Sequence, residues 1–410
     1  METQKDRESP YRFVILAVVL LIVSAALGLA RFGFTLLLPE MSFVFELDKF
    51  AEGMLGSVNL AGYLLLSLAG GILAAKFGSK AVVCISLAFV AASLFLTGIA
   101  PGFLTVAGGR FLTGLGSGGA NVPAMALLAV WFSKKSRGFA TGIASSGSSI
   151  GLIIAGIIVP VIIRAEGPSG FRTAWIIFAA VVTGVLIVAF IFLKNRPKQD
   201  AQIVKAVHIA ADPATGIMRG FGALLKTKEL WFFSTIYFLF GFAYIIFMNF
   251  FGVYLQKEAG FPKDQSGLLL FVIGIVSLSS GLVWGVLSDK IGRRPVLVII
   301  YTLNGIAFCL FGFLKDPVAL VAASMLFSVC AWSVPAVMAA IAGDVFGRRT
   351  QMGFGIMTFF FGCGQALGPL AAGAVAKVFS AYGPAIIMAG AVSLAGAILL
   401  LAVRSNKKPA

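Results

Sequence analysis

The fold of this chain is decided by residues 285–294, which read GVLSDKIGRR and follow a long apolar run. The two glycines of this stretch permit close approach of helices and a tight turn. Asp289 can cap the start of a helix and can pair with cations at a neighbouring helix end. A second stretch, GILAAKFGSK at residues 71–80, follows another apolar run and repeats the pattern with Ala75 in the acid position. The repetition predicts two related halves.

The composition is that of a protein that spans a membrane. The chain is 59% hydrophobic and 12% charged, and its mean hydropathy of +1.00 excludes a soluble globular domain. Apolar segments of roughly 18 or more residues can cross a hydrocarbon core about 30 Å thick. We predict twelve such helices, at residues 13–38, 53–74, 81–99, 104–132, 139–163, 173–193, 230–255, 266–287, 296–314, 317–342, 352–376 and 383–403.

The net charge of +16 reports orientation in the membrane. Basic residues gather before the first segment and in alternate loops, where the positive-inside rule places the cytoplasm. The rule therefore predicts that both termini are cytoplasmic, and we expect a lipid bilayer and no nucleic acid as partner. The basic clusters are Lys76/Lys80, Lys134/Lys135/Arg137, Lys194–Lys228, Lys290/Arg293/Arg294, Arg348/Arg349 and Arg404–Lys408.

One polar and basic stretch, residues 195–229, is too poor in apolar residues to span a membrane. It divides the chain into an N-terminal six-helix bundle (1–194), a cytoplasmic linker (195–229) and a C-terminal six-helix bundle (230–410). Pro123 in the fourth segment is matched by Pro335 in the tenth, and a basic turn follows each. We therefore predict an all-α membrane protein of twelve transmembrane helices in two pseudo-symmetric bundles.

The pattern at residues 285–294 resembles the signature of the major facilitator superfamily (MFS) of transporters. Residues 31–41 (RFGFTLLLPEM) and 53–63 (GMLGSVNLAGY) look like its YbfB/YjiJ-like bacterial branch. Residues 131–144 (WFSKKSRGFATGIA) resemble a turn of monocarboxylate and oxalate/formate porters. The resemblance implies a multi-pass carrier in the inner membrane of a bacterium that works by alternating access. It also implies a conformational-switch loop made of Asp289, Lys290, Arg293 and Arg294.

Two cations, Arg31 and Arg110, lie inside apolar segments, whereas every carboxylate is expected in a loop or at a segment end. A charge buried in hydrocarbon costs about 2.5–3.5 kcal/mol, so we expect each cation to have a role. A planar guanidinium suits bidentate capture of a carboxylate, so Arg31 is the principal candidate for binding an organic anion. The alternative for Arg31 is a salt bridge with Glu52 or Asp48. The alternative for Arg110 is a bond to carbonyls at a helix contact.

Further polar side chains within the segments are candidates for lining a binding site. Asn59 and Tyr63 share one helical face, as do Tyr237 and Tyr244. Each could also be an interfacial anchor or a bridge between helices. The predicted substrate-binding set is Arg31, Asn59, Tyr63, Arg110, Asn121, Tyr237, Tyr244, Trp332 and Gln365.

The predicted function is secondary active or facilitative transport of a small, monocarboxylate-like organic anion, with or without a co-transported proton. The sequence shows no catalytic triad, nucleotide loop or metal cluster, so we expect no enzyme activity, no cofactor and no metal. Without a buried acid, proton coupling through a titrating side chain is disfavoured.

Two alternatives stay open: efflux of amphipathic drug-like compounds, which the 38 phenylalanines would suit, and a non-transporting membrane sensor on a transporter scaffold. Monocarboxylate-type relatives carry an arginine in the eighth helix, and residues 278–284 (LSSGLVW) hold none, so the anion site is expected in the N-terminal half.

Overall fold

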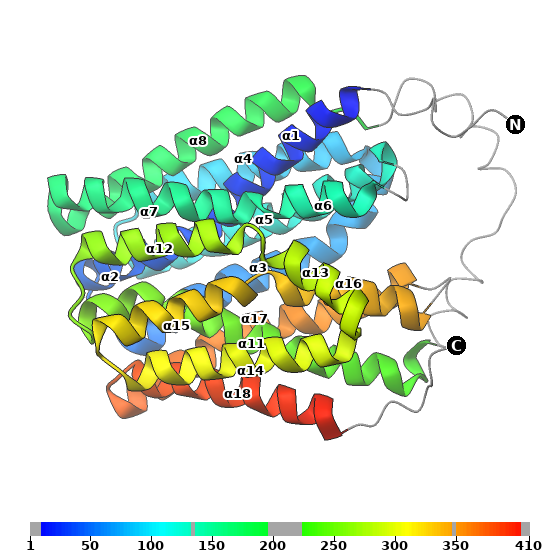
Figure 1. Cartoon of the computed structure of the whole chain (residues 1–410). Coiled ribbons are helices and arrows are strands. Elements are labelled where there is room, and N and C mark those ends of the chain that lie inside the picture. Colours follow the sequence, from blue (N-terminus) through cyan, green and yellow to red (C-terminus); the bar gives the residue numbers. More distant parts are fainter. Residues whose placement is uncertain (1–9, 133–135, 196–223, 347–349, 403–410) are drawn as a thin grey trace, which may run out of the picture. The chain divides into compact units, whose positions relative to one another are not determined.

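A computed structural model of the chain describes residues 10–132, 136–195, 224–346 and 350–402. Within these ranges the chain is helical and contains no strand (Figure 1). Nine helical stretches among the described residues are long and apolar enough to cross a membrane, and one of them, Gly138–Phe192, includes both α7 (Gly147–Glu166) and α8 (Phe171–Phe192). Some neighbouring helices are separated only by a short break. When these are counted as one segment, the described chain has twelve segments, which match the twelve predicted segments in order.

The contacts of the chain divide it into two compact units. Unit 1 comprises Met1–Phe34 and Val58–Gly220, and unit 2 comprises Thr35–Ser57 and Phe221–Ala410. The second half of the first helix and the start of the second, here called the 35–57 hairpin, thus belong to unit 2. The division into bundles 1–194 and 230–410 stays a prediction. Residues 196–223 of the predicted linker lie outside the described residues, as do Lys134, Lys135, Arg348, Arg349 and Arg404–Lys408 of the basic clusters.

Unit 1 is built from the helices of the first half of the chain. In this unit α4 packs against α5 and α8, and α7 packs against η2, where Gly28 and Gly151 meet backbone to backbone. Small residues permit such close helix contacts within a membrane. Its elements are α1 (Tyr11–Val23), the π-helix η2 (Ser24–Phe32), α3 (Lys49–Phe77) from Val58 on, α4 (Ser79–Gly98), α5 (Phe103–Trp131), α6 (Arg137–Ser145), α7 (Gly147–Glu166), the 3₁₀ turn η3 (Gly167–Gly170) and α8 (Phe171–Phe192).

Unit 2 adds the 35–57 hairpin to the helices of the second half. Helix α11 packs against α17 and α18, and α14 runs beside α18 (Figure 1). Its elements are α2 (Phe34–Val44) from Thr35 on, the first residues of α3, α11 (Lys228–Lys257), α12 (Lys263–Ser277), α13 (Ser280–Ile291), α14 (Arg293–Phe313), α15 (Pro317–Cys330), α16 (Ser333–Phe346), α17 (Thr350–Phe379) and α18 (Gly383–Ala402).

Three predicted helices are interrupted in the structure. The fifth breaks at Ser146 between α6 and α7, and the eighth breaks at Leu278–Ser279 between α12 and α13. Both breaks fall in runs of serine and glycine, which are common at helix kinks. The tenth breaks at Ala331–Trp332, between α15 and α16, and Pro335 in the first turn of α16 lacks the N–H that would bond the carbonyl of Ala331. These breaks were absent from the sequence-based prediction because hydropathy reports length and not continuity.

The first two helices extend further than predicted. The first runs from Tyr11 to Val44 through a π-helical segment, and the second begins at Lys49. The extensions bring Glu40 and Glu52 into helices, where they are 3% and 1% exposed. The expectation that the chain buries no carboxylate is therefore wrong. The error arose because both acids lie near the ends of apolar runs, where they resemble loop residues.

Candidate functional site

Arg31 lies in the π-helical segment η2 of unit 1 and is 6% exposed. Its guanidinium carbon sits 5.1 Å from the ring centre of Tyr63 and 5.3 Å from that of Phe32. These are cation–π distances. Asn121 on α5 donates a hydrogen bond of 3.0 Å from Nδ2 to the Tyr63 hydroxyl oxygen. Because that oxygen accepts from Asn121, the hydroxyl hydrogen of Tyr63 remains able to donate.

Arg110, on α5, is 1% exposed and is held by the neighbouring helices of unit 1. Its NH1 donates to the carbonyl of Ala30 at 2.9 Å. The guanidinium lies 4.1 Å from the ring centre of Phe34 and 5.8 Å from that of Trp175. The bond to Ala30 agrees with the alternative stated for Arg110, in which this side chain bonds carbonyls at a helix contact. Arg31 is close enough to Arg110 for the two positive charges to repel each other.

Asn59 lies on α3, one helical turn before Tyr63, and is 1% exposed. Its Nδ2 donates to the backbone carbonyl of Arg110 at 2.8 Å and so joins α3 to α5. Gly114 lies at the same crossing, where a Cβ atom would meet the backbone of Asn59. The predicted site residues of unit 1 therefore form two neighbouring groups: Arg31 with Tyr63 and Asn121, and Arg110 with Asn59.

An aromatic stack in unit 2 joins three of the other predicted residues. Tyr237 stacks on Phe361 with ring centres 4.3 Å apart, and Tyr244 stacks on Phe240 at 5.0 Å. Gln365, one turn beyond Phe361 on α17, donates from Nε2 to the Tyr244 hydroxyl at 2.6 Å. Phe240 and Phe361 were missed because a phenylalanine in an apolar helix carries no sequence signal that separates it from the core.

Trp332 lies at the break between α15 and α16 of unit 2. Its backbone N–H donates to Ser280 Oγ at 3.2 Å, at the start of α13. The hydrogen bond joins two of the broken helices. A role of Trp332 in substrate binding stays a prediction.

The predicted switch loop forms ion pairs inside unit 2. Arg293 bonds Asp289 at 2.5 Å, and its Nε bonds Asp344 of α16 at 3.1 Å. Arg294 donates from Nε to the carbonyl of Leu400 on α18 at 2.7 Å. Lys290 lies exposed at the end of α13. These contacts connect four helices of the unit, α13, α14, α16 and α18, and the part of the loop in conformational switching stays a prediction.

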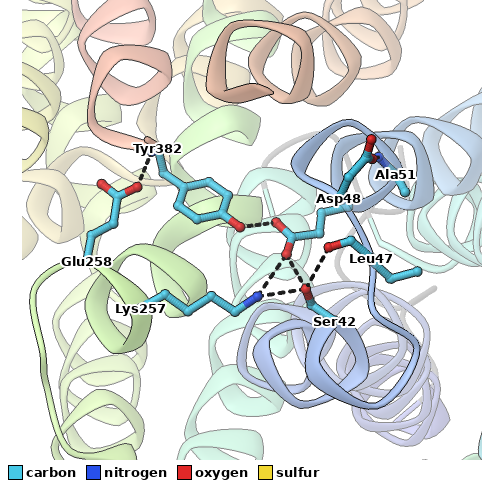
Figure 2. A network of polar contacts seen from close by, with 8 residues as sticks. Ser42, Leu47, Asp48, Ala51, Lys257, Glu258 and Tyr382 are labelled. Atoms are coloured by element: carbon cyan, nitrogen blue, oxygen red, sulfur yellow. Dashed lines mark hydrogen bonds and ion pairs between the residues drawn. The ribbon is translucent and has the colours of Figure 1, made fainter. Parts of the chain in front are cut away.

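A buried polar cluster of unit 2, which the sequence did not predict as a site, brings together Ser42, Lys257 and Tyr382 (Figure 2), and the carboxylate that they contact is that of Glu52. The Glu52 carboxylate accepts from Lys257 Nζ at 3.1 Å, from the Tyr382 hydroxyl at 2.5 Å and from the Ser42 hydroxyl. Lys257 also donates to Ser42 Oγ at 2.7 Å. We call Ser42, Glu52, Lys257 and Tyr382 the Glu52 cluster. Burial and the nearby Glu52 raise the pKa of Tyr382 far above its ordinary value, so the phenol keeps its proton.

The carboxylates proposed from sequence as partners of Arg31 form pairs within unit 2. Glu52 pairs with Lys257, and Asp48 accepts from Lys377 Nζ at 2.8 Å. The hydrogen bond from Lys377 holds the pKa of Asp48 below its ordinary value, helped by the backbone N–H of Ala51. Glu40, the other buried acid, pairs with Lys263 at 2.7 Å. Sequence could not find these pairs, because the partners are more than 200 residues apart in the chain.

Comparison with known proteins gives one family over nearly the whole chain. The family model that matches residues 23–401 is described as the uncharacterised MFS-type transporter YbfB. The chain is 27% identical to the probable sulfoacetate transporter SauU of Cupriavidus necator, over 85% of this chain and 84% of the relative. It is 24% identical to a hexuronate transporter of Bacillus subtilis, again over 85% and 84%.

A solved structure of similar fold is a bacterial homolog of the human lysosomal transporter Spinster, in an inward-facing and occupied conformation. The TM-score is 0.74 at 16% sequence identity, and the likeness covers 96% of this chain and 95% of that one. At this level of identity the likeness concerns the fold alone. It confirms the predicted major facilitator fold.

Proposed function

We propose that this chain, a multi-pass transporter that belongs to the YbfB family of MFS-type transporters, carries a small organic anion across the cytoplasmic membrane. Arg31 binds the acidic group of that anion. Both termini lie in the cytoplasm, as the distribution of basic residues predicts.

The observation that carries this proposal is the position of Arg31 in unit 1. A buried guanidinium lies against the Tyr63 ring, and Asn121 anchors the Tyr63 hydroxyl through its oxygen. This arrangement offers charge-assisted donors from the guanidinium and a hydroxyl donor beside it. A carboxylate or sulfonate accepts both kinds of hydrogen bond.

The charge of unit 1 supports an anionic substrate. Arg31 and Arg110 are buried in it. Among the described residues of the unit, Glu166 alone is acidic, and it lies exposed at the end of α7, where it accepts from Thr173. A positively charged and weakly solvated interior attracts anions and disfavours cations. Cationic drugs are therefore poor candidates for a substrate.

The names of the relatives support the same class of substrate. Sulfoacetate and hexuronate are both small organic acids that are ionised at neutral pH, and the two relatives named for them match most of this chain. A monocarboxylate-like acid is the class that we propose. Alternating access then requires that Arg31 face first one side of the membrane and then the other.

A second candidate, transport of amphipathic compounds, is favoured by the aromatic stack of unit 2. Tyr237, Phe240, Tyr244 and Phe361 form a continuous and largely buried stack of rings, whose chemistry suits an apolar or aromatic ligand. An anionic aromatic compound would be compatible with both features. Transport that depends on ring size and not on the acidic group would favour this second candidate.

The test is counterflow of radiolabelled sulfoacetate, galacturonate and acetate in proteoliposomes, with glucose as a neutral control. We expect exchange of at least one acid and none of glucose. Arg31→Ala should lower the rate about a hundredfold, because two charge-assisted hydrogen bonds of about 1.5 kcal/mol each are lost. Arg172→Lys is the matched control, since that guanidinium donates to the carbonyls of Gly98 and Ala100, and the variant should leave exchange unchanged.

Wild-type exchange in a folded Arg31→Ala protein would remove Arg31 from the substrate site. Absence of counterflow for every compound, in a protein that is folded and correctly inserted, would favour the sensor alternative. Exchange of glucose at the same rate as the acids would contradict the anion class.

A further inference from the structure

The end of α8 meets the start of α4 in a basic corner of unit 1. Lys194 and Asn195 follow the last turn of α8, and Asn195 Oδ1 accepts the backbone N–H of Lys80 at 2.7 Å. The same amide lies against Gly78, where a Cβ atom would meet Nδ2 at 2.6 Å. One amide thus joins two helix ends and places two lysines at the same end of the unit. We call Lys80, Lys194 and Asn195 the lysine corner.

Both ammonium groups of the lysine corner lie near aromatic rings. Lys80 Nζ is 5.2 Å from the ring centre of Phe190, and Lys194 Nζ is 3.9 Å from that of Tyr11. The Tyr11 hydroxyl donates to the carbonyl of Phe192 at 2.7 Å, so the start of α1 lies beside the end of α8 (Figure 1). These rings position the lysine side chains, while the ammonium N–H groups remain able to donate to an anion.

The described part of unit 1 supplies no counter-ion at this corner. Lys80 and Lys194 form no ion pair with a described residue. Glu166, the acidic residue of the unit in that part of the chain, lies just before the start of α8. Helix α8 has 22 residues, and at about 1.5 Å per residue it separates Glu166 from the corner by roughly 30 Å.

The matching corner of unit 2 contains its own acceptors. In the internal repeat, residues 71–80 correspond to residues 285–294, so Lys80 corresponds to Arg294. Arg294 donates to the carbonyl of Leu400, and its neighbour Arg293 pairs with Asp289 and Asp344. The comparison shows that cations at this place in the repeat can be satisfied by oxygen acceptors. At the lysine corner such an acceptor can come from outside the chain.

An exposed apolar surface begins directly beside the lysine corner. Phe190, the ring next to Lys80, is 64% exposed, and Ile187 on the preceding turn is also exposed. Ile85 and Phe89 extend the exposed surface along α4, which packs against α8. Exposed apolar side chains of a membrane span face acyl chains, and lysines at the end of a span reach the headgroup region. The two features together match the two parts of a phospholipid.

We propose that the lysine corner binds the headgroup of an anionic phospholipid whose acyl chains lie along α4 and α8. The phosphate oxygens accept hydrogen bonds from the ammonium groups of Lys80 and Lys194. In the predicted topology this end of unit 1 faces the cytoplasm, so the lipid belongs to the inner leaflet. The proposal concerns a surface of unit 1 and does not depend on which substrate is transported.

Native mass spectrometry of the full chain, released from detergent micelles, measures the affinity for added lipid. The probes are phosphatidylglycerol, which has a net negative charge, and phosphatidylcholine, which has none, with identical acyl chains. The wild type should bind phosphatidylglycerol roughly 25-fold more tightly, because each lysine near an anionic lipid contributes about fivefold. Lys80→Gln/Lys194→Gln should remove this preference, and added salt should weaken it in the wild type.

Asn195→Asp tests the corner with almost no change of shape. The carboxylate can still accept the backbone N–H of Lys80, and an acid at the start of α4 is favourable to the helix. It also adds a negative charge beside both lysines, which repels the lipid phosphate. The affinity for phosphatidylglycerol should fall about fivefold, the effect of one unit charge. This variant tests the site even if the double lysine variant fails to fold.

The matched control is Lys290→Gln/Lys315→Gln, which removes the same charge from two exposed lysines of unit 2. Lys290 corresponds to Lys76 in the repeat and lies next to Asp289, while Lys315 lies in the turn before α15. The control should keep the wild-type preference for phosphatidylglycerol. The thermal unfolding midpoint of each variant shows that the protein is folded.

Equal affinity of the wild type for the two lipids would overturn the proposal. So would a preference that survives in both Lys80→Gln/Lys194→Gln and Asn195→Asp, or one that the unit 2 control loses to the same extent. Inorganic phosphate that displaces the lipid at equal concentration would assign the corner to a free anion and overturn the lipid assignment. Failure of anion counterflow would contradict the proposed function and leave the lipid site unaffected.

Discussion

Unit 1 and unit 2 treat buried charge in opposite ways. In unit 1 the guanidinium groups of Arg31 and Arg110 lie against aromatic rings, and Arg110 also bonds a backbone carbonyl. In unit 2 the carboxylates of Glu40 and Glu52 lie beside lysines. The described residues of unit 1 thus bury positive charge, whereas unit 2 pairs each of these buried carboxylates with a lysine. This difference is the basis of the proposed anion site in unit 1.

The largest effect on stability is expected from Arg110→Ala in unit 1. The substitution removes the bond to Ala30 and empties the space between Phe34 and Trp175, which should cost about 3–5 kcal/mol. The thermal unfolding midpoint in detergent measures it. Arg31→Ala should lower the midpoint much less while it removes anion binding. Equal losses of stability in the two variants would abolish the distinction between a structural and a substrate-binding arginine.

A smaller effect is expected from Lys257→Met in unit 2. The variant leaves Glu52 buried without its cation, which should cost about 1–3 kcal/mol. The double variant Glu52→Gln/Lys257→Met should recover part of this loss, because it removes both charges at once. A double-mutant cycle on the unfolding midpoints measures the coupling. Additive losses would show that the two residues do not stabilise each other.

The smallest effect is expected from Asp48→Asn, whose pair with Lys377 is half exposed or more. Such surface pairs contribute about 0–1 kcal/mol. Since the pKa of Asp48 is lowered in the folded protein, the contribution is present above the ordinary value of 3.8 and is lost as pH falls below it. Unfolding midpoints of the wild type and the variant should therefore converge in acid and differ slightly at neutral pH. A difference that appears only in acid would have the wrong sign.

Much of the fold could be predicted from sequence, because the length and polarity of apolar runs determine which segments span a membrane. The family resemblance at residues 31–41 and 285–294 is confirmed by the family model over residues 23–401. The helix breaks near Ser146, Leu278 and Trp332 were not predicted. They depend on local backbone geometry, which hydropathy does not report.

The candidate site could be predicted from the sequence only in part. The residue type and the segment of Arg31 pointed to it, and the helical face shared by Asn59 and Tyr63 is present. The two residues nevertheless contact different arginines, since Asn59 bonds the backbone of Arg110 and the Tyr63 ring lies against Arg31. The Glu52 cluster escaped prediction because its members come from α2, α3, α11 and the turn before α18. Only the folded chain brings them together.

The π-helical segment η2 has a consequence for comparing this chain with its relatives. A π-helical turn holds about one residue more than an α-helical turn, and it is most simply described as a single inserted residue. Deleting one residue between Ser24 and Phe32 would turn the two flanking parts of the helix by about 100° relative to each other. Arg31 and Thr35 could then no longer both keep their present neighbours, Tyr63 and Met248. Relatives that share this geometry should keep the length of the segment, and those without it should show a one-residue gap there.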